Sequence, residues 1–285
     1  MTERMVAAAQ YALPKRALTR IAGSFARAEW GRVTHWAIGR FVARYGVNMA
    51  EAANPHIDSY ASFNDFFTRP LRADARPLAR SGYLCPVDGA ISQFGAIERD
   101  QIFQAKGHGY SVQALLAGDA ALAAEFAGGQ FATLYLSPRD YHRIHMPCAG
   151  RLRAMVHVPG ALFSVNPATA RAVPGLFARN ERVVCVFDTA CGPMALVLVG
   201  AAIVGSVATV WHGRVNPPRP GHVRCWDYAQ VAPVELARGA EMGRFLLGST
   251  VVLLLPGETL QFNPAWAPGA AIRMGECMGQ PVMRG

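Results

Sequence analysis

The stretch RFLLGSTVVLLL at residues 244–255 carries no charge after Arg244 and predicts a buried β-strand. Within it, the Gly248–Ser249 pair has two interpretations. Glycine in a strand commonly marks a bulge or a close backbone contact. The pair also permits chemistry on the chain itself, because the Ser249 hydroxyl can add to the Gly248 carbonyl and turn the amide into an ester. β-Elimination and hydrolysis would then leave a pyruvoyl group at a new N-terminus.

Two other segments carry the side chains that such a reaction needs. Residues 135–147 read YLSPRDYHRIHMP and contain His142 and His145, and residues 84–90 read LCPVDGA and contain Asp88. An imidazole can take the proton of a serine hydroxyl, and a carboxylate can fix the imidazole tautomer and stabilise its cation. We therefore predict that these three side chains gather around the serine. The alternative is a pair of surface histidines and an aspartate that only caps its turn.

The remainder of the chain predicts an α+β fold. From Gly82 onward, short β-rich segments are separated by Gly and Pro. Residues 111–126 predict a helix, whereas residues 166–180, with two prolines, predict a loop that lines or covers a site. Residues 189–211 are uncharged and long enough to span a bilayer, but glycines break the run and its β-branched content predicts buried strands. We expect a β-rich body of mixed or antiparallel sheets with an N-terminal amphipathic helical segment.

Positive charge is concentrated near the N-terminus. Residues 1–46 hold eight basic and two acidic residues, and so carry six of the chain's nine net positive charges. Apolar residues recur there at helical spacing between arginines: Trp30, Val33, Ala37, Phe41 and Tyr45. A cationic amphipathic helix suits an anionic bilayer surface, whereas the alternative is a helix packed on the body with its basic face in water. We expect a membrane-associating segment at 1–50 and a catalytic domain at 51–285.

Composition narrows the class of protein. Hydrophobic residues make up 52% of the chain and charged residues 16%, below the ~25% charged of an average soluble domain, which favours contact with a membrane. The six cysteines form no CxxC pair and no histidine spacing fits zinc, so we expect reduced thiols and no metal. Residues 1–16 lack the architecture of a signal peptide. Nucleic acid is disfavoured, because no binding motif accompanies the basic residues.

Six blocks of the sequence occur together in one known order. In chain order they are SFNDFFTRPLR (62–72), PVDG (86–89), KGHGYSVQALLAG (106–118), YHRIHMP (141–147), NERVVCVFDT (180–189) and GRFLLGST (243–250). In order and approximate spacing, the chain resembles the bacterial, pyruvoyl-dependent phosphatidylserine decarboxylases of the prokaryotic type I. The resemblance covers roughly residues 60–280, and several blocks in register are far more specific than any one of them.

The resemblance implies a self-processing enzyme. The chain would be cut between Gly248 and Ser249 into a long chain 1–248 and a short chain 249–285, and Ser249 would become the pyruvoyl cofactor. His145 matches the base of chain cleavage, with Asp88 as its orienting partner. His142 matches a histidine associated with the decarboxylation step or the phosphate headgroup.

The implied substrate and location follow from the same family. The substrate is phosphatidylserine in an anionic membrane, and the product is phosphatidylethanolamine. The keto carbonyl reacts with the amine of the headgroup and withdraws the electrons left when carbon dioxide departs. The cleaved chains would form a heterodimer or a dimer of heterodimers, peripheral on the cytoplasmic face of the inner membrane.

Other functions stay open from the sequence. One is a serine hydrolase using Asp88, His145 and Ser249, although no GxSxG elbow surrounds the serine. Another is a pyruvoyl decarboxylase of a soluble amino acid, and a third is a noncatalytic membrane adaptor. Arg139 and Arg143 either pair with a lipid phosphate or anchor their strand to a local carboxylate.

Overall fold

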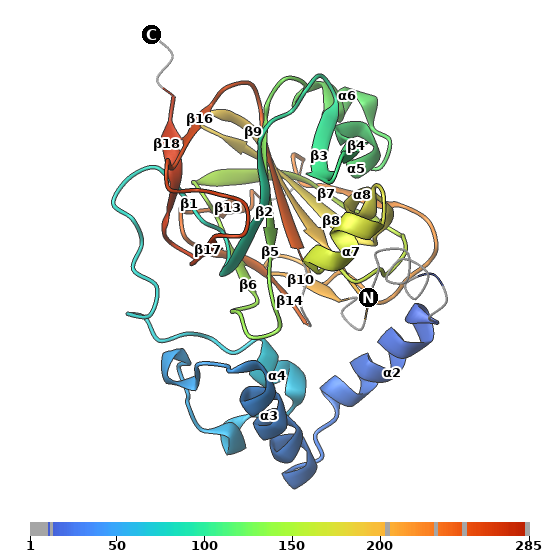
Figure 1. The fold of residues 1–285 in the computed structure, drawn as a ribbon, viewed down its shortest axis with the longest axis vertical. Helices are drawn as coiled ribbons and strands as arrows, with labels where there is room; N and C mark the ends of the chain where they lie inside the picture. The colour runs from blue at the N-terminus through green and yellow to red at the C-terminus, as the bar shows by residue number, and fades with distance from the viewer. Residues whose placement is uncertain (1–10, 12–13, 203–205, 231–232, 247–249, 283–285) are drawn as a thin grey trace.

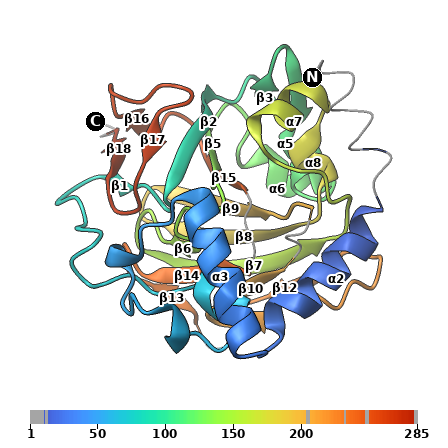
Figure 2. The ribbon, with the colours of Figure 1, turned by 60° about the horizontal axis from the view of Figure 1, so that its bottom comes forward.

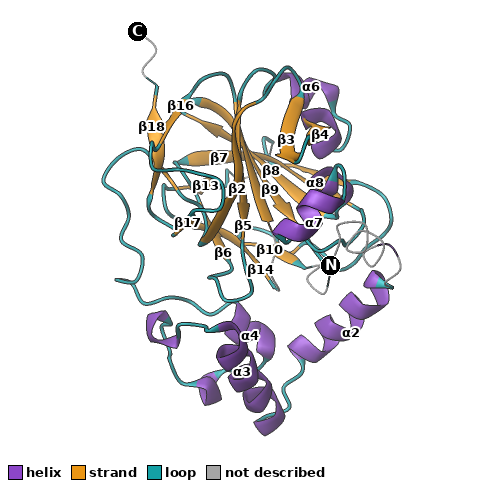
Figure 3. Cartoon of the chain, viewed as in Figure 1, coloured by secondary structure: helices purple, strands orange, loops and turns teal. Residues whose placement is uncertain are grey.

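A computed structural model describes residues 11, 14–202, 206–230, 233–246 and 250–282. It has a β-rich body, with one group of helices beneath it and another at its side (Figure 1, Figure 3). The paired strands of every sheet run antiparallel. The predicted α+β class is confirmed.

The largest sheet has nine strands, in the order β12-β7-β8-β9-β15-β5-β2-β17, with β13 also paired to β7. Their bounds are β2 Gly89–Ala96, β5 Gln130–Tyr135, β7 Gly150–Val158, β8 Arg182–Thr189, β9 Gly192–Val199, β12 Arg224–Asp227, β13 Glu235–Leu236, β15 Thr250–Leu255 and β17 Ala271–Ile272. β15 is buried along its whole length. Its alternate residues enter two different apolar clusters, with Val251 and Leu253 on one face and Val252 and Leu254 on the other. A strand between two cores is apolar on both faces, which explains the unbroken run VVLLL after Thr250.

Three smaller sheets complete the body. One has the order β11-β10-β14-β6, another β1-β18-β16, and the third is the β3-β4 hairpin. Their bounds are β1 Tyr83–Leu84, β3 Gln101–Ala105, β4 His108–Ser111, β6 Arg143–His145, β10 Val207–Thr209, β11 Gly213–Arg214, β14 Glu241–Phe245, β16 Leu260–Phe262 and β18 Cys277–Pro281. The predicted run 189–211 accordingly forms strands in its described residues, and no described helix is long and apolar enough to cross a bilayer.

Short helices cover one side of the large sheet. They are α5 Val112–Leu115, α6 Ala120–Ala124, α7 Pro167–Ala172 and α8 Leu176–Arg179. The helix predicted at 111–126 is confirmed as two pieces, broken where Ala117 and Gly118 adopt positive φ. The prediction of a loop at 166–180 is wrong, because Asn166 caps α7 and the buried residues of α8 join the core.

The N-terminal helices form a cluster of their own. They are α2 Lys15–Arg27, α3 Arg32–Tyr45, the 3-10 turns η1 Met49–Glu51 and η2 Ile57–Ser59, and α4 Phe63–Phe67. Helices are confirmed in the described part of the predicted segment, and Figure 2 shows α2 and α3 in front of one end of the body. Phe41 of the predicted apolar stripe packs inward, with its ring centroid 5.1 Å from that of Phe63. The cluster therefore continues past residue 50 to the end of α4.

Candidate active site

The predicted strand 244–255 is two strands in two different sheets. β14 ends at Phe245 in the four-stranded sheet, and β15 begins at Thr250 in the large sheet. The sequence predicted one strand because the apolar character continues across the junction, where the chain changes sheet. Gly248 and Ser249 lie at this junction, outside the described residues.

Of the two predicted histidines, His142 directly precedes β6 and His145 is its last residue, and β6 is the neighbour of β14. The N–H of Phe245 donates to the backbone oxygen of His142 at 3.0 Å, and Glu241 pairs in register with His145. The chain therefore approaches Gly248 directly beside the segment that carries both imidazoles. His142 is buried and His145 is half-buried, so they are not a pair of surface histidines.

His145 is held by two hydrogen bonds. Its Nδ1 donates to the carbonyl of Gly239 at 2.8 Å, which leaves Nε2 to accept from the Tyr141 hydroxyl at 3.0 Å. Burial lowers the pKa of His145, opposed mainly by the bond to Gly239. The neutral tautomer with an accepting Nε2 is the form that a general base requires.

His142 is a buried imidazole with one free nitrogen. Its Nδ1 donates to the carbonyl of Asp140 at 2.7 Å, and its Nε2 has no partner among the described residues. The ring packs against Phe67 of α4, with centroids 4.1 Å apart. Burial lowers the pKa of His142 to about 3, so the ring is neutral at pH 7 and Nε2 presents a lone pair.

This burial predicts a dependence of stability on pH. Between pH 6.5 and about 3 the unfolded chain protonates His142 while the folded chain does not. Stability therefore falls as pH falls through this window, by up to ~1.4 kcal/mol per unit from this group. Replacing His142 with glutamine should flatten the decline. Urea unfolding at stepped pH measures it, and an equally steep decline in the variant would contradict the assignment.

Asp88 has partners other than the one predicted. Its carboxylate accepts from Arg76, whose Nε lies 2.9 and 3.1 Å from the two oxygens, and from the backbone N–H of Met274 at 2.8 Å. No hydrogen bond joins Asp88 to His145 among the described contacts, because the Arg76 fork occupies the carboxylate and Gly239 already orients the ring. Asp88 nevertheless lies close enough for its charge to raise the pKa of His145, as a minor influence beside burial. The predicted orienting bond is thus replaced by an electrostatic contact.

Arg139 and Arg143, whose roles the sequence left open, have different surroundings. Arg143 donates to the backbone oxygen of Thr68 at 2.8 Å and forms an ion pair with Glu241 at 2.8 Å. It therefore anchors β6 to α4 and to β14. Arg139 keeps 67% of its side chain exposed and lies 3.9 Å from Asp140 at its nearest.

Two arginines of the segment after α4 escaped the sequence analysis. Arg69 is 3% exposed and lies against Phe66, with its guanidinium carbon 5.2 Å from the ring centroid. Arg76 joins Asp88 to Glu51, whose Oε2 lies 2.7 Å from its Nη2. The only available signal was the density of arginines in TRPLRADAR at 68–76, which is equally typical of an exposed loop.

A cavity of about 360 Å³ opens beside Asp88, between the end of α3 and the body. Its lining contains four arginines and three acidic residues: Arg69, Arg76, Arg139, Arg273, Glu51, Asp88 and Asp140. Arg76 is the best paired of these arginines. Burial alone would lower its pKa, but the hydrogen bonds to Asp88 and Glu51 outweigh burial and raise the pKa.

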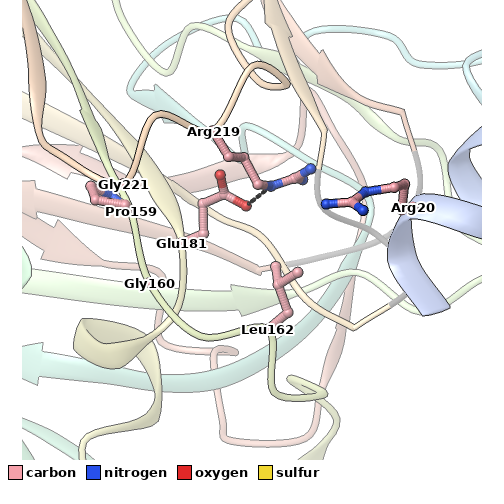
Figure 4. A pocket seen from close by; sticks show the side chains of 7 residues that line it. All are labelled: Arg20, Pro159, Gly160, Leu162, Glu181, Arg219 and Gly221. Carbon is pink, nitrogen blue, oxygen red and sulfur yellow. Dashed lines mark hydrogen bonds and ion pairs between the residues drawn. The ribbon is translucent and has the colours of Figure 1, made fainter. Parts of the chain in front are cut away.

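A smaller cavity of about 130 Å³ lies where Arg20 of α2 faces the body (Figure 4). At its floor Glu181 accepts from Arg219 Nε at 2.7 Å and from His157 Nε2 at 2.9 Å. Burial opposes ionisation of Glu181, but these bonds outweigh burial and lower its pKa. The Glu181 carboxylate thus already has its partners within the fold. We therefore interpret the residues around this cavity as a structural ion-pair network.

Comparison with known proteins agrees with the resemblance. The family model described as phosphatidylserine decarboxylase matches residues 63–280, and a second model, described as PSD, matches residues 6–46. The chain is 70% identical to the phosphatidylserine decarboxylase proenzyme of Verminephrobacter eiseniae, over 98% of this chain and 99% of that protein. It is 68% identical to the proenzyme of Albidiferax ferrireducens, over 98% of each chain. Likeness of this extent, over a chain whose two predicted histidines adjoin the approach to Gly248, shows that the protein belongs to the phosphatidylserine decarboxylase family.

Proposed function

We propose that this protein decarboxylates phosphatidylserine to phosphatidylethanolamine, using a pyruvoyl group made from Ser249. The observation that supports this most directly is the change of sheet between β14 and β15. It brings the chain leading into Gly248 against the backbone of His142, at 3.0 Å from Phe245 N, while β15 is separately paired. A break between the two strands then removes no ladder hydrogen bond from either sheet.

The cut yields chains 1–248 and 249–285, which stay together as a heterodimer. β15 pairs with β5 on one side and β9 on the other, and β18 pairs with β1. Because each of these partners belongs to the long chain, the short chain remains part of two sheets. Its buried strand contributes to both apolar clusters of the body.

In cleavage, His145 takes the proton of the Ser249 hydroxyl as it adds to the Gly248 carbonyl. The carbonyl of Gly239 fixes the tautomer, and the nearby charge of Asp88 stabilises the cation that forms. The sequence assigned both roles, fixing the tautomer and stabilising the cation, to Asp88 alone. In this proposal the Gly239 carbonyl takes the first role and Asp88 keeps the second.

In decarboxylation, the pyruvoyl group supplies an electron sink for the electrons left by departing carbon dioxide. The described residues fit such a group, since the Nε2 of His142 is buried, neutral and without a partner. We assign to this nitrogen the proton that the substrate ammonium loses as its amine reacts, and the return of that proton to the substrate carbon. The packing of His142 against Phe67 keeps water from this nitrogen.

Intact-mass spectrometry of the purified protein tests the proposal. We expect two chains that correspond to residues 1–248 and 249–285, the second with a blocked N-terminus. Ser249→Ala should remain one chain and release no carbon dioxide from phosphatidylserine vesicles. An active sample with the mass of the uncut chain would overturn the proposal.

The same samples separate the rival functions. A serine hydrolase would remain one chain and react with a fluorophosphonate at Ser249. A decarboxylase of soluble amino acids would release carbon dioxide from L-serine as readily as from the lipid. A membrane adaptor would remain uncut and release none, so each rival gives a different result.

We further propose that α2 and α3 hold the protein on the cytoplasmic face of the inner membrane. Large apolar side chains lie exposed on these helices and the turn between them: Leu18, Ile21, Phe25, Trp30, Val33 and Trp36. They are accompanied by the basic residues of the same segment. Together these features suit insertion into the headgroup region of an anionic bilayer.

Changing two of these side chains should weaken binding to anionic vesicles. Ile21 is 68% and Trp36 67% exposed, so replacing both with serine should leave the fold intact. Each large apolar side chain contributes ~1.5–3 kcal/mol when fully buried, so we expect a loss of ~100-fold or more. Phe103→Ser is the control, because Phe103 is 47% exposed on β3, at the opposite end of the body. Equal binding by all three proteins in vesicle sedimentation would refute the assignment.

A further inference from the structure

The cavity beside Asp88 contains a buried cation with unused donors. Arg69 is 3% exposed, and no described carboxylate lies within ion-pair distance of it. Its Nε has no partner, and its two other contacts are long, at 3.5 Å to the Phe66 oxygen and 3.4 Å to the Arg139 oxygen. A guanidinium has five N–H donors, and leaving them unmatched in a buried place is costly.

We propose that Arg69 binds the phosphodiester of the substrate headgroup, an inference that rests on the proposed function. A guanidinium matches two phosphate oxygens with parallel hydrogen bonds. The cost of burying Arg69 without a counter-charge is then offset when the lipid binds. Arg139 and Arg273, at 67% and 60% side-chain exposure, line the same cavity and add positive charge where it meets solvent.

The acidic residues of the cavity do not neutralise Arg69. Asp88 and Glu51 are both engaged by Arg76, and Asp140 accepts from the backbone N–H of Ser137 at 2.6 Å. Burial accordingly lowers the pKa of Arg69, against weaker effects of the surrounding charges. An anionic group that enters the cavity meets one unmatched guanidinium within it.

The strand register sets the distance from this cavity to the chemistry. Thr250, the first described residue after Ser249, lies opposite Tyr135, which lies opposite Ala90. Ala90 follows Gly89, which lines the cavity. Two strand spacings amount to ~10 Å. This separation suits a headgroup whose amine reacts at the end of β15 while its phosphate, a few bonds away, reaches the long side chain of Arg69.

The lipid side of the cavity also fits. Gly46 and Asn48, which follow α3 directly, line it. The cavity therefore opens at the end of α3, one of the two helices whose exposed apolar residues are proposed to enter the bilayer. A phosphate just below the acyl chains of a bound lipid can enter there while those chains remain near the membrane.

Phosphate is favoured over the carboxylate by the reaction itself. The carboxylate becomes neutral carbon dioxide, so an ion pair to it would weaken on the way to the transition state and slow the reaction. The phosphate keeps its charge throughout. Binding it lowers KM without opposing the departure of carbon dioxide.

Competition experiments with the processed enzyme test this inference. The variants are Arg69→Met and Arg69→Lys, with Arg72→Gln as a control, because Arg72 is exposed and pairs with Asp74. The probes are glycerophosphoethanolamine, which has the phosphodiester and no carboxylate, and L-serine, which has the carboxylate and no phosphate. Substrate turnover is measured with short-chain phosphatidylserine.

For Arg69→Met we expect inhibition by glycerophosphoethanolamine to weaken ~10–100-fold, the range for hydrogen bonds to a charged group. KM for phosphatidylserine should rise with a smaller change in kcat, and any effect of L-serine should stay unchanged. The unfolding midpoint should not fall, since an unmatched buried charge is removed. Arg69→Lys keeps the positive charge but not the paired guanidinium donors. Its inhibition by glycerophosphoethanolamine should lie between that of Arg69→Met and that of the unaltered protein.

Each alternative has its own outcome. If Arg69 held the carboxylate, the effect of L-serine would weaken and that of glycerophosphoethanolamine would not. A lower unfolding midpoint with unchanged inhibition would assign Arg69 a structural role and overturn the proposal. Should the methionine variant fail to fold, unchanged inhibition in the lysine variant overturns it equally. Absence of decarboxylation by the unaltered protein would instead refute the proposed function.

Discussion

Replacing His145 with alanine should leave the chain uncut, whereas replacing His142 with alanine should give two chains that decarboxylate poorly. The Nδ1 of His145 is committed to Gly239, and its Nε2, which accepts from the Tyr141 hydroxyl in this structure, takes the serine proton once that hydroxyl turns aside. Loss of a general base typically lowers a rate by ~10²–10⁴-fold, enough to preserve the precursor through purification. His142 has its own free nitrogen and contacts the approach to Gly248 only through its backbone.

Mass spectrometry after timed incubation, followed by a carbon dioxide assay, measures both effects. Asp88→Asn should also slow cleavage, because it removes the charge that stabilises the cation of His145. Complete cleavage of the His145 variant would remove this residue from the processing step. An uncut His142 variant would show that the two histidines act together before the break.

Replacing Arg76 with methionine should destabilise the precursor by ~3–5 kcal/mol, the usual cost of breaking a buried ion pair from one side. The side chains of Arg76 and Asp88 are only 7% and 9% exposed, and Glu51 loses the same partner. Asp88 would then have no guanidinium partner, and Glu51 would keep only its longer pair with Arg273, at 3.5 Å. Cleavage should slow as well, because Asp88 would no longer be fixed beside His145.

Urea unfolding in a Ser249→Ala background measures this effect on one uncut chain. Arg72→Met is a matched control from the same segment, since its pair with Asp74 is 54% and 74% exposed and such pairs contribute ~0–1 kcal/mol. An equal, small loss in both variants would show that Arg76 does not stabilise the site.

Local pattern was sufficient for much of this protein. The apolar run at 244–255 predicts a buried strand, and its second half forms one, β15. The paired histidines and the PVDG turn identify segments that the fold brings together, since His145 donates its backbone N–H to Pro86 at 2.9 Å. The strand prediction succeeded because it depends on residues close in sequence, whereas the approach of the PVDG turn to the histidine segment was expected from the chemistry that an activated serine needs.

What the sequence missed depends on distant contacts. No local pattern indicates that Gly239 orients His145, or that Arg76 and not the imidazole would occupy Asp88. The helices at 166–180 were missed because prolines suggested a loop, although Pro167 begins α7 and the buried side chains of α8 hold this segment on the core. Likewise, Phe41 belongs to the inner face of α3 only because α4 packs there.

The position of β15 has a consequence for the mature protein. Folding of the precursor joins β15 to its neighbours within one molecule, at an effective concentration set by the chain. After the break, reassembly from the denatured state becomes an encounter between two separate polypeptides, one of which exposes a strand of six residues, five of them Val or Leu, that is liable to aggregate. Maturation would then be irreversible in practice, because the fold must be completed before the break and is not readily regained afterwards.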